Sequence, residues 1–253
     1  MRKYQNTERI KTEAIVLKAI DYQENAQIVS FYGPLGRFNL LVKGTKKMTS
    51  KTRGFTEILT LENIDHTVNH SLGALVTAEV LNSYLNIKND FTKMQIASCM
   101  IEKMYFLGHL VKNSELAFTF FKRSLELLEK TKYPHHILCI FDTKLCYLLG
   151  IEPIVNKCAS CGKENPTNQY FLPEAGGIVC LDCTAHYIHA PLNEENTKNI
   201  KYLYLIKLEK VDDVFLSQLS LDIREVNEKI DEYYQRYLDF DSKAKKIYYK
   251  LCF

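Results

Sequence analysis

Four cysteines, arranged as two pairs, have the spacing of a metal site. Cys158 and Cys161 form one C-x2-C pair, Cys180 and Cys183 form the other, and eighteen residues separate the pairs. Thiolates are soft ligands that Zn²⁺ prefers, and four of them complete its tetrahedral shell. Because four protein ligands leave no position for water or substrate, the spacing predicts one structural Zn²⁺ ion per chain.

Other interpretations of these cysteines stay open at this point. They could be four unrelated buried thiols, or one pair could act as a redox dithiol, although no βαβ pattern surrounds it. His186 or His189, just after the last cysteine, could replace one sulfur as a ligand. Four further cysteines lie in apolar helical sequence and are expected to be buried core thiols: Cys99, Cys139, Cys146 and Cys252.

A run of cations marks a candidate nucleic-acid-binding segment. Residues 43–53 hold five cations and no acid, and residues 1–55 carry a net charge of +7 within a chain whose total is +3. Lysines, arginines and hydroxyls contact phosphates without reading bases, so this stretch indicates a polyanionic partner. The alternative is a solvated loop without a ligand. The candidate contacts are Arg37, Lys43, Lys46, Lys47, Lys51 and Arg53.

The residues that surround this basic segment read as a small barrel. Alternating apolar residues predict strands at 13–20, 26–32, 37–42, 56–63 and 75–80. Five short strands in about eighty residues are typical of a closed OB-fold barrel, which we expect over residues 1–80. Four aromatic side chains could stack on bases or fill the barrel core: Tyr22, Tyr32, Phe38 and Phe55.

From residue 82 the apolar period changes from 2 to about 3.6, which predicts a helical domain over residues 81–253. Ser114 is a suitable N-cap for its second helix, and Gly150 a suitable stop for its third. The cysteine pairs fall between helices, so the zinc-binding unit is expected as an insert at about 154–191. The fold class is therefore α+β and multi-domain, a five-stranded OB-fold barrel followed by an all-helical domain with an inserted four-cysteine zinc unit.

Composition limits the compartment and the class of protein. The 253 residues are 46% hydrophobic and 25% charged, which are ordinary globular values. The first residues carry no apolar signal region, and no apolar run reaches the length of a membrane span. We therefore expect a cytoplasmic protein, in a reducing compartment that favours metal-bound cysteines over disulfides.

With these motifs, the chain resembles the RecO family of bacterial DNA recombination and repair proteins over essentially its whole length. The leucine–glycine–proline lead-in to the cysteines and the basic segment after the third strand are the most specific parts. The matching residues are EAIVL at 13–17, YQE at 22–24, Gly36, KG at 43–44, LCYLLGIEP at 145–153, CASCG at 158–162, GGIVC at 176–180 and Cys183.

The resemblance implies a non-enzymatic mediator of recombinational repair. Such a protein binds single- and double-stranded DNA, anneals complementary strands and helps load recombinase on protein-coated single strands. The implied partners are RecR and the acidic tail of single-stranded DNA-binding protein, and the implied location is the nucleoid. Two alternatives are a nuclease and a zinc-ribbon regulator. A nuclease needs clustered carboxylates, whereas the acidic pairs at 194–195 and 212–213 are adjacent and face different ways on a helix.

Overall fold

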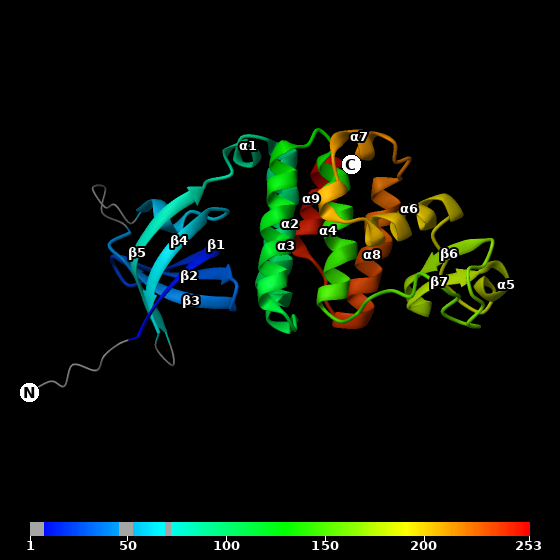
Figure 1. The fold of residues 1–253 in the computed structure, drawn as a ribbon, viewed down its shortest axis with the longest axis horizontal. Coiled ribbons are helices and arrows are strands. Elements are labelled where there is room, and N and C mark those ends of the chain that lie inside the picture. The colour runs from blue at the N-terminus through cyan, green and yellow to red at the C-terminus, as the bar shows by residue number, and fades with distance from the viewer. Residues whose placement is uncertain (1–7, 46–52, 69–71) are drawn as a thin grey trace, which may run out of the picture. The chain divides into compact units, whose positions relative to one another are not determined.

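A computed structural model describes residues 8–45, 53–68 and 72–253. The chain divides into two compact units. Unit 1 comprises residues 1–89 and 101–122, and unit 2 comprises residues 90–100 and 123–253. Each unit is described by itself below (Figure 1). Domain limits at 1–80 and 81–253 stay a prediction.

Unit 1 is built on a closed barrel of five strands, in the order β1-β2-β3-β5-β4. All neighbours are antiparallel except β3 and β5, which run parallel. The long β1 closes the barrel because its first half pairs with β4 and its second half with β2. This arrangement confirms the OB-like barrel. The strands are β1 (Arg9–Tyr22), β2 (Ala26–Gly33), β3 (Gly36–Lys43), β4 (Leu61–Thr67) and β5 (Gly73–Asn82) (Figure 1).

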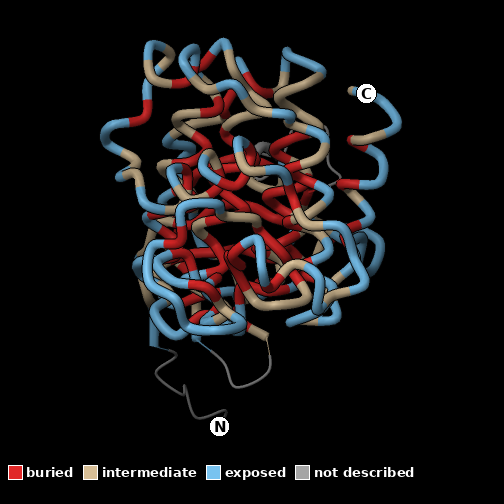
Figure 2. The backbone as a smooth tube through the Cα atoms, turned by 90° about the vertical axis from the view of Figure 1, so that its right-hand side faces the viewer, coloured by how far each residue is buried: buried red, intermediate tan, exposed pale blue. Residues whose placement is uncertain are grey.

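Alternating side chains fill the barrel. In β3, Leu40 and Val42 point into the core while Arg37 and Lys43 are exposed, as a strand period of two requires. A bulge in β1 between Val16 and Lys18 shifts the register, so that Lys18 is exposed and Ala19 packs against the core. Over the chain as a whole, buried stretches lie inward and exposed stretches lie mostly at the outside (Figure 2). The core cluster is Ala14, Val16, Val29, Phe31, Leu40, Val42 and Ile64.

The fourth strand was predicted too early in the sequence, at 56–63. A 3₁₀ turn, η1 (Arg53–Thr56), occupies the start of that range, and β4 begins only at Leu61. Leu59 is fully buried with φ 61°, and its N–H donates to the Val16 carbonyl at 3.0 Å. The alternating apolar residues there reflect an irregular segment held against β1. An apolar period alone does not separate such a segment from a strand.

Residues 101–122 belong to unit 1 and cover part of the outer face of the barrel. Tyr32 is buried there, its hydroxyl donating to the Gly108 carbonyl at 3.3 Å and its ring meeting Phe121 edge-on at 6.5 Å. A Cβ at residue 108 would lie 2.5 Å from the Tyr32 ring, so only glycine fits there. The elements involved are α1 (Leu85–Lys88), α2 (Phe91–Leu107), η2 (Gly108–Leu110) and α3 (Ser114–Lys130).

The predicted N-cap of α3 was wrong by one residue. Asn113 caps this helix, because its side chain accepts from the Leu116 N–H at 2.9 Å and its carbonyl from the Ala117 N–H at 3.1 Å. Ser114 and Asn113 are both favoured N-cap residues, so the sequence does not choose between neighbours. The predicted stop at Gly150 is confirmed by its φ of 73°.

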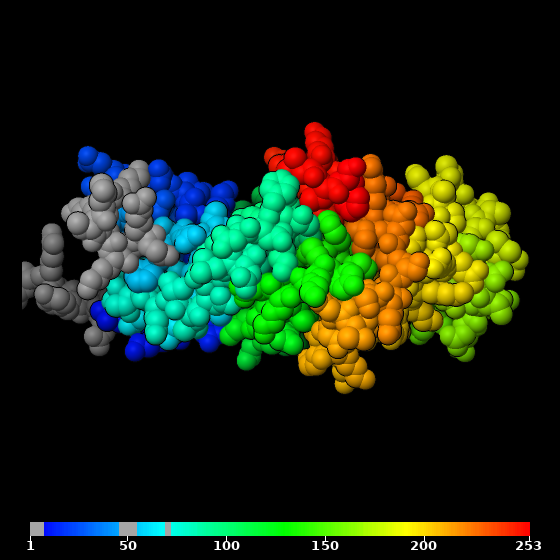
Figure 3. Space-filling model, turned by 90° about the horizontal axis from the view of Figure 1, so that it is seen from above, coloured from blue at the N-terminus to red at the C-terminus, as the bar shows by residue number. Residues whose placement is uncertain are grey.

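Unit 2 is helical and carries the cysteine segment between α4 and α6. A hairpin of two strands forms the centre of that segment, and the ring of Tyr233 in α8 packs against Phe171 of the hairpin, with centroids 5.8 Å apart and planes at 34°. Segment 154–191 forms a continuous group beside α8 in Figure 3. The elements are α4 (Pro134–Leu148), β6 (Gln169–Leu172), η3 (Pro173–Ala175), β7 (Gly177–Cys180), α5 (Leu181–Thr184), α6 (Glu194–Leu205), η4 (Leu208–Lys210), α7 (Asp213–Ser217), α8 (Ile223–Leu238) and α9 (Lys243–Cys252).

A buried ion pair lies inside unit 2. The Lys245 ammonium is 2.7 Å from Asp142 and 2.8 Å from Asp231, and the first two side chains are 1% and 0% exposed. Burial alone would lower the pKa of Lys245, but the two carboxylates hold it well above its usual value. Among the described residues, no helix is long and apolar enough to cross a membrane.

Candidate metal centre and nucleic-acid interface

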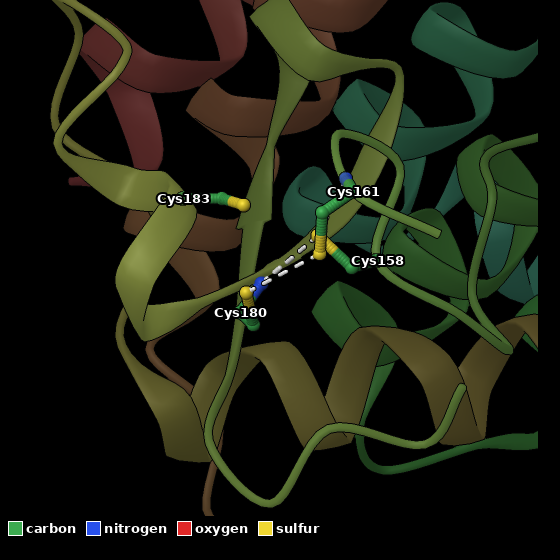
Figure 4. A group of neighbouring side chains, drawn as sticks. All are labelled: Cys158, Cys161, Cys180 and Cys183. Carbon is green, nitrogen blue, oxygen red and sulfur yellow. Dashed lines mark hydrogen bonds between the residues drawn. The ribbon is translucent and has the colours of Figure 1, made fainter. Parts of the chain in front are cut away.

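The four paired cysteines converge on one point (Figure 4). All four Sγ atoms lie within 4.8 Å of one another, and those of Cys161 and Cys180 are 3.8 Å apart. Zinc–sulfur bonds of about 2.3 Å place tetrahedral sulfurs about 3.8 Å apart, so the cluster has the size that a Zn²⁺ ion requires. Three of the four side chains are buried and Cys161 is exposed.

Backbone bonds bring the first pair to the second. The N–H of Ala159 donates to the Ile178 carbonyl at 2.7 Å. The N–H of Ile154 donates to the Gly176 carbonyl at 3.0 Å, and the Ile154 carbonyl accepts from the Ile178 N–H of β7 at 2.8 Å. A Cβ at Gly177 would lie 2.3 Å from the Ile154 carbonyl oxygen, so glycine permits this close approach. The first knuckle closes with the Gly162 N–H on the Cys158 carbonyl at 2.9 Å and a Gly162 φ of 77°.

Hydrogen bonds from backbone amides lower the pKa of the Cys158 thiol. Burial raises the pKa of this thiol, but hydrogen bonds from the backbone of Cys161, Cys180 and Ser160 and from the Cys161 side chain together lower the pKa to about 6. The N–H groups of Cys161 and Cys180 lie 3.5 and 3.4 Å from the sulfur. A thiol that ionises easily is a ready metal ligand.

Neither histidine joins the cluster. Within the described residues, the group that could hold a metal ion consists of the four cysteines. His189 instead places its Nδ1 atom 2.8 Å from Glu174. Of the remaining cysteines, Cys99, Cys139 and Cys146 are buried, as expected. Cys252 is only half-buried.

The structure describes only some of the residues predicted to contact DNA. Arg37 and Lys43 stand on the same outer face of β3, both exposed, at opposite ends of the strand. Six residue steps separate them by about 20 Å. Arg53 begins η1. Lys46, Lys47 and Lys51 lie outside the described residues.

Arg37 has a partner that the sequence did not reveal. Its guanidinium donates to the Tyr105 carbonyl at 2.5 Å and lies over the Tyr105 ring at 4.8 Å, while the Lys18 ammonium lies over the same ring at 4.9 Å. Tyr105 is sixty-eight residues away along the chain, and no local pattern links it to β3. Sequence reasoning therefore missed both Lys18 and Tyr105.

Lys43 lines a hollow of about 500 Å³ next to the β1–β2 turn. The Gly44 N–H donates to the Asn25 carbonyl at 2.6 Å, which ties the end of β3 to this turn. Tyr22, just before the turn, is 41% exposed. Of the four aromatic side chains considered for stacking, Tyr32 is buried, Phe38 packs on the core ring of Phe31 and Phe55 is half-buried. Tyr22 is therefore the most exposed of the four. The hollow is lined by Gln23, Glu24, Asn25, Ala26, Lys43 and Gly44.

The fold and the site define a class: an OB-like barrel followed by a helical unit that carries a four-cysteine metal-type cluster. Comparison with protein families agrees. Residues 7–84 match the model described as Recombination protein O N terminal, and residues 88–246 match Recombination protein O C terminal. The chain belongs to the RecO family of DNA repair proteins.

Several curated relatives carry the name DNA repair protein RecO. The one from Caldanaerobacter subterraneus subsp. tengcongensis is 30% identical over 246 residues, covering 96% of this chain and 98% of the relative. The one from Dehalococcoides mccartyi is 27% identical over 222 residues, covering 85% and 87%. The one from Oceanobacillus iheyensis is 24% identical over 245 residues, covering 96% and 94%.

Proposed function

We propose that this chain is a non-enzymatic DNA-binding mediator of recombinational repair, which binds single- and double-stranded DNA and anneals complementary strands. The observation that carries the proposal is an OB-like barrel with cations along the exposed face of β3, in a chain of the RecO family. The β2–β3 face of this fold is the one that binds oligonucleotides in other proteins.

Annealing brings two polyanions together, and a dense cationic surface lowers their repulsion without ATP. The proposed contacts are Arg37, Lys43, Lys46, Lys47, Lys51 and Arg53. Lysines and arginines on phosphates give affinity with little sequence preference, which suits a protein that pairs strands of any sequence.

The proposed cofactor is one structural Zn²⁺ ion held by Cys158, Cys161, Cys180 and Cys183. When bound, the ion cross-links the first knuckle to β7 and α5 and so stabilises segment 154–191. Since four thiolates complete its shell, no position is left for substrate chemistry, and its proposed role is to hold the fold.

The proposal extends to partners and place. The barrel module over residues 1–80 binds DNA, the helical domain over residues 81–253 carries the zinc insert, and together they help load recombinase on protein-coated single strands. The proposed protein partners are RecR and the acidic tail of single-stranded DNA-binding protein. A protein with these partners works in the cytoplasm, at the nucleoid.

A salt titration of binding tests the proposal. If about five phosphates are neutralised on a single strand, log K falls with log salt with a slope near −3.5. Replacing Lys46, Lys47, Lys51 and Arg53 by glutamine should weaken binding to all sequences equally and make this slope shallower by about 2.8. The matched control replaces four exposed lysines of unit 2 by glutamine: Lys130, Lys198, Lys207 and Lys210.

If the basic-segment variant keeps the affinity and the salt slope of wild type, the basic segment is not the DNA-binding site. Degradation of DNA in Mg²⁺ would favour the nuclease alternative, and a strong preference for one duplex sequence would favour the zinc-ribbon regulator.

A further inference from the structure

A cluster of two cations and two aromatic rings lies on unit 1, near the end of β3 that is remote from the basic segment. We call it the Tyr105 cluster: Lys18, Arg37, Tyr105 and Phe106. The Lys18 ammonium and the Arg37 guanidinium lie 4.9 and 4.8 Å from the centre of the Tyr105 ring. Phe106 meets that ring edge-on, with centroids 4.9 Å apart and planes at 87°.

Three separate elements build this cluster. The bulge in β1 pairs Lys18 with Ser30 on the outer face of the barrel. Arg37 follows the tight turn between β2 and β3 and is exposed on the same face. Tyr105 and Phe106 come from the last turn of α2, which the Arg37–Tyr105 hydrogen bond of 2.5 Å holds against the strand.

At the Tyr105 cluster, the outer face of the barrel changes from buried to exposed side chains. Tyr32, which pairs directly with Arg37 across β2 and β3, is buried against Gly108 and Phe121, whereas Lys18, Arg37 and Asn39 are exposed. The Phe106 ring is 50% exposed although it is large and apolar. The Tyr105 cluster is therefore exposed to solvent, at the edge of the area of the barrel that residues 101–122 cover.

Cations beside exposed aromatic rings are the combination that single-stranded nucleic acid requires. A base stacks on a ring with little regard to its identity, and lysine or arginine binds the phosphates on either side. Cations held over a ring by cation–π attraction are also already placed and partly desolvated. The position on the β1–β2–β3 face agrees with the oligonucleotide face of the fold.

We propose that the Tyr105 cluster is a second single-stranded nucleic-acid contact, in which a base stacks on Phe106 while Lys18 and Arg37 bind its phosphates. This inference rests on the proposed function, because it adds a named contact to the same DNA-binding barrel. A strand that also reaches the basic segment follows β3 for about 20 Å. Arg37 then has two roles, since it binds the Tyr105 carbonyl and its positive charge attracts the phosphate.

The test compares binding of two oligonucleotides of equal length, twelve thymidines and twelve abasic residues, by fluorescence anisotropy. The variants are Phe106→Ala and Lys18→Gln, with Phe91→Ala and Lys250→Gln as matched controls at exposed sites of the same residue types. Phe106→Ala should weaken thymidine binding about tenfold and leave abasic binding nearly unchanged, because only a base stacks. Lys18→Gln should weaken both and make the salt slope shallower by about 0.7.

Photo-crosslinking of an oligonucleotide that carries 5-iodouracil gives a second readout on the unaltered chain. Attachment at Tyr105 or Phe106 supports the inference. If both variants bind like wild type while the basic-segment variant loses affinity, the inference is overturned and the proposed function stands. If the wild type binds no oligonucleotide, both fall. If the variants keep DNA binding but lose binding to an acidic peptide such as deca-aspartate, the cluster is a peptide surface and the inference is overturned.

Discussion

Glutamine in place of Glu62 should stabilise the barrel at alkaline pH. Glu62 lies on β4 opposite Ala14, whose side chain is in the barrel core, and its own side chain is fully buried. Neither of its carboxylate oxygens has a hydrogen-bond partner among the residues that the structure describes. Burial raises the pKa of Glu62 from 4.5 to about 8, although the charge of Lys88 partly opposes this shift.

The sign of the effect follows from proton binding. The folded barrel holds the Glu62 proton more tightly than the unfolded chain does, so stability is highest at low pH and is lost as the pH rises from about 4.5 through about 8. Between pH 6 and pH 8.5 this one group should cost about 2–3 kcal/mol of unfolding free energy. Glu62→Gln has no proton to lose and keeps the shape of the side chain.

Urea unfolding followed by circular dichroism at both pH values measures the effect. The variant should gain about 2–3 kcal/mol relative to wild type between pH 6 and pH 8.5. Glu57→Gln is the matched control, because Glu57 pairs with Lys88 at 2.9 Å but is 60% exposed. A stability difference between variant and wild type that does not change with pH would refute this reasoning.

Three further predictions concern packing and metal. Lys245→Met should cost about 3–5 kcal/mol of unfolding free energy in urea, because it leaves Asp142 buried without its cation, and a loss below 1 kcal/mol would contradict the buried pair. Gly108→Ala should lower stability by about 1–3 kcal/mol, since its Cβ would meet the Tyr32 ring at 2.5 Å; an unchanged thermal midpoint would contradict that contact. Elemental analysis should find one zinc per chain in wild type and a large loss in Cys161→Ser, whereas zinc retained in full would show that this thiol is not a ligand.

Local patterns in the sequence were sufficient for much of the fold. The cysteine pairs, the alternation in β3 and the stop at Gly150 each depend on a few neighbouring residues, and all three agree with the structure. The period change near residue 82 likewise separates the strands from the helices. These features could be predicted from the sequence because each depends on a single turn or a single strand.

Features that depend on distant residues escaped prediction. The Arg37–Tyr105 contact joins β3 to α2, and Lys245 meets Asp142 across about a hundred residues of sequence. No local pattern marks Glu62 as buried, because only barrel closure shows that its position faces inward. The start of β4 was missed for the same reason, since Leu59 is buried by its contact with β1.

Annealing of complementary single strands without any nucleotide tests the central proposal most directly. Fluorescence quenching between two labelled strands would follow the rate with wild type, with the Lys46, Lys47, Lys51 and Arg53 glutamine variant, and with chelator-treated protein. We predict rapid annealing by wild type without ATP, a large loss in the variant, and a loss with the chelator only as far as segment 154–191 unfolds. Annealing at the uncatalysed rate with wild type, or an unchanged rate in the variant, would contradict a cationic barrel that joins DNA strands.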